Sequence, residues 1–118
     1  MKQVPANNPY NIRFTQSQFG PDYLFTITGG DLVTGPHIGA VATAYWQDDE
    51  LRVVCNELPS HREGDLAREM ALLAARKLGS TCTVVCGIHI DDATSEQIAE
   101  IVQYVRSGFN NLLEVKHA

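Results

Sequence analysis

The order of hydrophobic periodicities along this chain constrains its fold more than any other feature. Four segments with the alternation or β-branched content of strands come first, and two segments with helical spacing follow, separated by a fifth strand-like segment. We expect the strands at residues 10–15, 23–28, 37–46, 51–55 and 81–90. Successive strands favour an antiparallel meander, and helices that come after them favour coverage of one face. The sequence therefore predicts an α+β fold, a two-layer sandwich of a mostly antiparallel five-stranded sheet with two helices packed on one face.

The first predicted helix has local signals at both ends. Ser60 and Glu63 have the spacing of a capping box, with Gly64 able to delay the start, and Gly79 stands where a C-terminal glycine belongs. Its apolar stripe has the i, i+4, i+7 and i+8 spacing of an amphipathic helix and comprises Leu66, Met70, Leu73 and Ala74.

The second predicted helix begins at Thr94, which has Gln97 three residues further on as a capping partner. Gly108 is its expected end, and residues 109–118 are expected to add a further short turn or helix. Its apolar stripe comprises Ile98, Ile101, Val102 and Val105.

Length and composition limit the classes of protein to which the chain can belong. Its 118 residues, 44% of them apolar, suit a flexible N-terminal arm over residues 1–9 and a single domain over residues 10–118. The net charge of −5, without a basic cluster, argues against nucleic-acid binding. No run approaches the roughly 18 apolar residues of a membrane span, and the first residues lack the apolar run of a secretory signal. Three cysteines cannot all pair, which favours a cytoplasmic protein; Cys82 and Cys86 are expected in the core.

Two of the predicted strands carry the same short pattern in opposite directions. One face of the third strand begins with the pattern His-x-Gly-x-Val, and one face of the fifth strand ends with the pattern Val-x-Gly-x-His. Adjacent glycines would leave a bare backbone floor beside two imidazoles, and a flat aromatic ligand suits such a floor. With antiparallel pairing in register, the neighbours would be His37 with His89, Gly39 with Gly87 and Val41 with Val85.

The same residues also allow a plainer interpretation. Glycines in strands can mark bulges, and a single histidine on a strand is more often solvated or hydrogen-bonded than functional. A slip of one residue would turn one of the two faces over and separate the pattern.

Two further segments are candidates for binding an anion. The glycine-rich loop that begins at Gly29 and Gly30 offers successive backbone amides, although it has no Walker sequence. His61 and Arg62 lie near the expected start of the first helix, where free amides and the helix dipole favour anions. The alternatives are a plain turn in the first segment and a solvated arginine in the second.

Five short motifs resemble a known family. They occur in order as ITGG (27–30), PHIG (36–39), PSH (59–61), Gly79-Ser80 with Cys82-Thr83, and GIH (87–89), and a helix with Gln97-Ile98 follows. In these motifs the chain resembles the prenylated-flavin chaperones of the LpdD-like family, associated with gallate decarboxylase. The loop between Gly30 and Pro36 is longer than in the family pattern.

The resemblance implies a cofactor, a partner and a site. The cofactor is prenylated FMN, or FMN, which the protein would hold, mature or deliver as an accessory to a UbiD-type aromatic-acid decarboxylase. A flavin prenyltransferase is a further possible partner, and a homodimer is expected. The flavin ring would lie on the face with His37 and His89, on a floor of Gly39 and Gly87, and the expected apolar walls are Val41, Val85 and Tyr45. The phosphate would go to the glycine loop at Gly29 and Gly30 or to the helix start at His61 and Arg62.

Two other functions are alternatives to this chaperone role. One is a small metal-dependent enzyme that uses His37, His61 and His89, since imidazole suits zinc, copper and iron. The other is a purely structural subunit of the decarboxylase. We expect a binding protein more than an enzyme, with help in the oxidative maturation of the flavin left open. The fifth strand is apolar on one face. If it lies at the edge of the sheet, a second copy of the chain would cover it, which is a further reason to expect a dimer.

Overall fold

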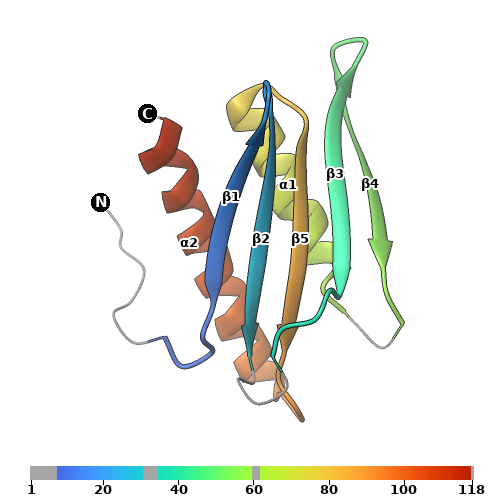
Figure 1. Ribbon diagram of the computed structural model, residues 1–118. Coiled ribbons are helices and arrows are strands. Elements are labelled where there is room, and N and C mark those ends of the chain that lie inside the picture. Colours follow the sequence, from blue (N-terminus) through green and yellow to red (C-terminus); the bar gives the residue numbers. More distant parts are fainter. Residues whose placement is uncertain (1–7, 31–34, 60–61, 118) are drawn as a thin grey trace.

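Five strands and two helices form the part of the chain that the computed structural model describes, residues 8–30, 35–59 and 62–117. Both helices pack on the same side of the sheet (Figure 1), so the predicted α+β two-layer architecture is confirmed. The elements are β1 (Arg13–Phe19), β2 (Asp22–Gly30), β3 (Ala40–Gln47), β4 (Glu50–Glu57), α1 (Gly64–Leu78), β5 (Cys82–His89) and α2 (Ser95–His117).

The strand order in the sheet is β1-β2-β5-β3-β4, with β2 and β5 parallel and all other neighbours antiparallel. The predicted meander in chain order is therefore wrong, because β5 lies between two hairpins (Figure 1). A strand that carries no charged residue between Cys82 and Ile88 suits a central position with neighbours on both sides. Since β5 is not an edge, its apolar face gives no reason to expect a dimer.

The two hairpins have tight turns with positive φ angles. Gly20 (φ 59°) lies in the turn between β1 and β2, as the glycine-containing turn signal predicted. Asp48 and Asp49 (φ 52° and 65°) form a two-residue connection between β3 and β4. Positive φ at both positions is the conformation of type I′ hairpins, in which aspartate is tolerated.

The core lies between the sheet and the helices. Small residues dominate where α1 meets β3, because Ala40, Ala42 and Ala44 are fully buried. Their short side chains let the helix backbone come close to the sheet. Met70 is buried as predicted. Trp46 is 41% exposed, and its indole N–H donates to the Ala75 carbonyl at 3.2 Å.

Two of the four helix ends follow the predicted signals, the end of α1 and the start of α2. Glu63 is the N-cap residue of α1, which begins at Gly64, while Ser60 lies outside the described residues. Gly79 ends α1 in the left-handed conformation (φ 65°). Thr94 and Gln97 form the expected reciprocal capping box at α2, with bonds of 2.9 and 3.1 Å.

The predicted end of α2 at Gly108 is wrong, because the helix continues without interruption to His117. A glycine inside a helix costs about 1 kcal/mol relative to alanine. Phe109 and Leu113, both buried, continue the apolar stripe beyond Gly108, and their burial outweighs that cost.

Candidate functional site

The mirrored pattern of the third and fifth strands corresponds to a real strand pair. β3 and β5 are antiparallel, and Val41 pairs with Val85 as expected. The regular ladder begins at Ala40, three residues later than the predicted strand, and pairs it with Cys86. The amide of Gly39 also donates to the Cys86 carbonyl, at 2.9 Å, so the residues before Ala40 follow β5 in an irregular conformation.

His37 and His89 lie side by side at the end of this strand pair. Their ring centroids are 6.4 Å apart, and the rings are nearly perpendicular, at 86°. One ring nitrogen of His89, Nε2, lies 2.9 Å from Asp91 Oδ1, which holds this imidazole in place. Two neighbouring imidazoles, one of them anchored by Asp91, can hydrogen-bond to a polar ligand. The sequence predicted this pair correctly.

The floor beside the histidines is not bare at Gly87. A Cβ built at this position would lie 1.6 Å from the carbonyl oxygen of His37, so the chain itself fills the space above the glycine. The expectation of an empty shelf is therefore wrong here. Gly87 instead allows the backbone before β3 to cross closely over β5, and this crossing places the His37 ring beside His89.

The glycines at the end of β2 have a similar structural role. Gly30 has a φ of 99°, and a Cβ there would lie 1.8 Å from the His89 carbonyl oxygen. A Cβ at Gly29 would lie 2.5 Å from Ile12 Cδ1 and 3.1 Å from the Tyr10 carbonyl oxygen. Both positions are therefore filled by the protein's own atoms, and the loop residues 31–34 lie outside the described residues.

The face opposite the helices extends from the histidines across the sheet. Val41 and Val85 are half-buried on this face, as expected for apolar walls. Tyr45 lies five residues beyond Ala40, where the regular strand begins, or roughly 16 Å further from the histidine end at the rise of a strand. A tricyclic ring is too short to contact both, so we leave Tyr45 out of the candidate site.

Three residues of this face escaped the sequence prediction. Thr26 pairs with Val85, and Thr28 pairs with Gly87, because β2 runs parallel to β5. Arg13 pairs with Thr28 on the other side, which places an exposed guanidinium in the same row of the sheet. The alternation of residues 10–15 already predicted that Arg13 points away from the core. Its position relative to β5 depended on strand order.

The start of α1 already holds two carboxylates. Glu57 Oε2 accepts from the Gly64 amide at 2.7 Å. Glu63 accepts from the Ile88 amide at 3.1 Å and from the Arg62 amide at 3.0 Å. Because these acids occupy the position where an anion would bind, this helix start does not suit a flavin phosphate. The other residue predicted there, His61, lies outside the described residues.

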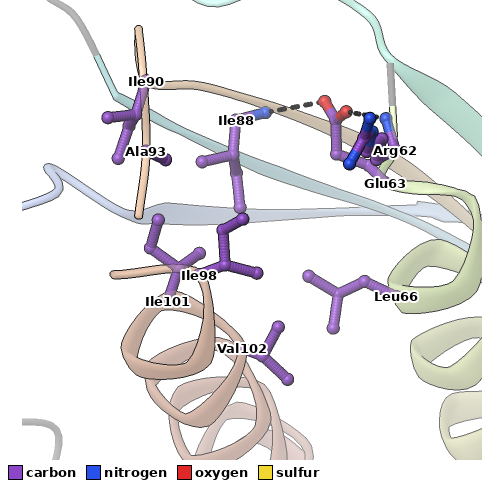
Figure 2. A pocket seen from close by; sticks show the side chains of 9 residues that line it. All are labelled: Arg62, Glu63, Leu66, Ile88, Ile90, Ala93, Ile98, Ile101 and Val102. Atoms are coloured by element: carbon purple, nitrogen blue, oxygen red, sulfur yellow. Dashed lines mark hydrogen bonds between the residues drawn. The ribbon is translucent and has the colours of Figure 1, made fainter. Parts of the chain in front are cut away.

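Arg62 instead lines a cavity on the helix side of the sheet, together with Glu63 (Figure 2). The cavity has a volume of about 360 Å³ and lies between the start of α1, the end of β5 and the start of α2. Its walls are mainly aliphatic and include Leu66, Ile88, Ile90, Ile98, Ile101 and Val102. The predicted site residues thus fall on two sides of the sheet, with the histidines on the open side.

The cysteines are structural. All three are free, and Cys82 and Cys86 are fully buried on the helix side of β5, as predicted. Burial raises the pKa of Cys82 to about 11 and that of Cys86 to about 12. Both thiols therefore stay protonated at neutral pH and are poor nucleophiles.

The metal-dependent alternative requires His61 beside His37 and His89, and His61 lies outside the described residues. Within the described ranges, no group of three or more histidine, cysteine, aspartate or glutamate side chains is placed to hold an ion. In the same part of the chain, neither helix has the length and the apolar run needed to cross a bilayer.

The structure is an α+β domain whose open sheet face carries a pair of neighbouring histidines, and comparison with known proteins gives its class. The sequence model of one protein family, the prenylated flavin chaperone LpdD-like domain, matches residues 6–116, and the chain belongs to this family. It is also similar to protein LpdD of Lactiplantibacillus plantarum, with 32% identity over 92 residues. That alignment covers 76% of this chain and 65% of LpdD, so the chain spans less than two thirds of that relative. The family resemblance of the short motifs is thereby confirmed.

Proposed function

We propose that this protein holds prenylated FMN, or FMN, and delivers it to a UbiD-type decarboxylase. Membership of the prenylated flavin chaperone family supports the role. The observation that carries the proposed site is the contact between the rings of His37 and His89 on the open face. The bound flavin would supply the electrophilic and redox chemistry that the decarboxylase uses, and this chain would bind and orient it.

The residues of the open face suit a flavin. A flat ring can lie beside His37 and His89 and over the Val41–Val85 pair. On this face, β3 and β5 carry no acidic or basic side chain further along the strands. The hydroxyl of Thr28 and the two imidazoles would supply hydrogen-bonding groups for the polar edge of the ring, whereas the Thr26 hydroxyl is bonded to that of Thr15. Arg13 lies in the same row of the sheet as Thr28 and Gly87 and would pair with the phosphate.

The histidines are tested by titration of the purified protein with reduced prenylated FMN under anaerobic conditions, and with FMN. We expect the double variant His37→Ala, His89→Ala to bind at least tenfold more weakly, because each lost contact is worth about 1 kcal/mol. Tyr45→Ala, on β3 but distant from the pair, serves as the control and should bind as the parent does. Unchanged affinity in the double variant would refute the site.

The phosphate contact is tested by comparing FMN with riboflavin, which lacks the phosphate. We expect Arg13→Gln to weaken FMN binding about fivefold, as for an exposed ion pair of about 1 kcal/mol, and to leave riboflavin binding unchanged. Arg62→Gln should leave both affinities as they are. An FMN-specific loss in Arg62→Gln and none in Arg13→Gln would move the phosphate to the other side of the sheet.

The proposed chaperone role also implies a cellular location, a mode of action and protein partners. The protein would act in the cytoplasm, by binding more than by turnover, with the decarboxylase large subunit as its partner. Two further predictions are that a flavin prenyltransferase donates the cofactor and that the protein is a homodimer. Analytical ultracentrifugation of the protein alone and mixed with the prenyltransferase checks both. A stable complex with the decarboxylase without any flavin affinity would favour a purely structural subunit.

A further inference from the structure

The helix-side cavity described above, which we call the apolar socket, has no role in the proposed flavin site. It opens at the same end of the molecule as the histidine pair but on the opposite side of the sheet, as Ile88 and His89 point to opposite faces of β5. Figure 2 shows its aliphatic side chains converging from α1, β5 and α2 around an unfilled centre. At about 360 Å³ it is at the small end of the range of ligand pockets, with room for one or two aliphatic side chains.

The socket leaves apolar surface in contact with water. Ile98 belongs to the apolar stripe of α2, yet it is 47% exposed and faces the socket instead of the core. Ile88, Ile90 and Val102 are only partly buried. Burial of such side chains by a partner is favourable in proportion to the area removed from water.

Charge around the socket selects the kind of partner. Glu63 lines it, Asp92 lies two residues after Ile90, and Glu96 lies two residues before Ile98. The last two are exposed, and Arg62 is the single basic residue among the described lining residues. Three carboxylates against one guanidinium disfavour an anionic ligand and favour a partner with basic residues.

Two exposed apolar side chains lie beside the segment that carries His37. Ile38 is 55% exposed and stands between His37, whose carbonyl lies against Gly87, and Gly39, whose amide bonds to Cys86. Leu58 is 43% exposed and donates its amide to the Gly39 carbonyl at 2.8 Å. A protein docked on the socket would therefore also meet the end of the sheet that carries the proposed flavin site.

We propose that the apolar socket receives an aliphatic side chain of the partner decarboxylase, presented on a segment in which lysines or arginines flank that side chain. The inference rests on the proposed function for the identity of the partner. It adds the docking surface and the chemistry that recognises it, and it places docking on the side of the sheet opposite the bound flavin.

The test measures binding of the purified UbiD-type decarboxylase of the same organism to immobilised parent and variants. Ile98→Ser should weaken binding at least tenfold, since Ile98 is an exposed wall of the socket. Phe19→Ser is the matched control, because Phe19 is 64% exposed but lies in the β1–β2 hairpin far along the sequence from every lining residue, and it should bind as the parent does. Glu96→Lys, at an exposed position where folding is not at risk, should slow association with the decarboxylase severalfold. Raising the salt concentration should weaken the binding of the parent protein.

Several results would overturn the proposal. Binding of Ile98→Ser and Glu96→Lys at the parental level would exclude the socket as the docking surface. A parental dimer that Ile98→Ser converts to a monomer would assign the socket to a second copy of this chain, and a small molecule retained in parent but lost in Ile98→Ser would assign it to a ligand. Flavin titration of the same variants separates the two proposals, because a failure of docking alone leaves flavin affinity intact. No binding between parent and decarboxylase would overturn this inference together with the partner of the proposed function.

Discussion

At the scale of single residues, glycine governs the geometry of the candidate site. Gly87 and Gly30 each contact a backbone carbonyl, of His37 and His89 respectively, at a distance that no side chain tolerates. These contacts join the end of β2, the end of β5 and the segment before β3. The histidine pair is therefore a product of close backbone packing as much as of the imidazoles themselves.

Gly87→Ala should consequently separate the two histidines. The added methyl group would overlap the His37 carbonyl, so the segment before β3 must move, and we expect a loss of about 1–3 kcal/mol in the free energy of unfolding. Flavin affinity should fall with it. Urea denaturation and flavin titration measure the two effects.

Gly35→Ala is the control for this prediction. Its φ of 75° costs an alanine about 1 kcal/mol, but a Cβ there meets no atom of the described residues within 4 Å. It should lose stability without a change in the contact between His37 and His89. Equal flavin affinity in Gly87→Ala and the parent would show that the crossing does not position the site.

At the scale of elements, α2 is longer than its local sequence suggests because the core requires it. Phe109 packs edge-on against Phe25 of β2, with ring centroids 5.0 Å apart. Arg106 donates two hydrogen bonds, of 2.8 and 2.9 Å, to Glu69 of α1 on the exposed side. The C-terminal half of α2 is therefore held by the sheet below it and by the helix beside it.

Phe109→Ala should be among the most damaging single substitutions. A buried phenylalanine that is truncated to alanine typically costs about 3–5 kcal/mol, a large part of the stability of a small domain. Phe19→Ala removes the same group from an exposed position and should change stability by less than about 0.5 kcal/mol. Thermal unfolding of both variants checks the comparison, and similar losses would contradict the assigned core.

Local sequence patterns predicted the helices and strands and their buried faces well, but they predicted which strands are neighbours in the sheet less well. Alternation along the strands identified which side of β3 and β5 is buried, and the mirrored order of His37 and His89 predicted the pairing of these two strands. Nothing local shows that β5 enters between β2 and β3, and for that reason Arg13 and Thr28 were missed. Gly108 misled the prediction because a helix-ending preference is weaker than the burial of Phe109.

At the scale of the whole molecule, one core serves all the elements. The buried cluster includes Phe25 of β2, Ala42 of β3, Met70 of α1, Val84 of β5 and Phe109 of α2. The sheet separates this core from the open face, which carries the proposed flavin site. Flavin binding and docking of the decarboxylase can therefore occur at one end of the molecule without competing for the same atoms.

A shared core should give a single cooperative unfolding transition. Trp46 is the only tryptophan, and its bond to the Ala75 carbonyl makes its fluorescence report on the contact between β3 and α1. Far-ultraviolet circular dichroism reports on both helices. We expect the two signals to give the same urea midpoint, whereas separate midpoints would show that α2 unfolds on its own.

The central position of β5 also determines the order in which the molecule can be assembled. The hairpins β1–β2 and β3–β4 share no strand pairing, and β5 is the element that joins them. A chain emerging from the ribosome therefore carries two separate ribbons, each with an unpaired inner edge, until Cys82–His89 is available. Loop closure over these long separations makes the joining step slow compared with formation of either ribbon. Nascent chains that stop before β5 are accordingly the species most exposed to edge-to-edge aggregation.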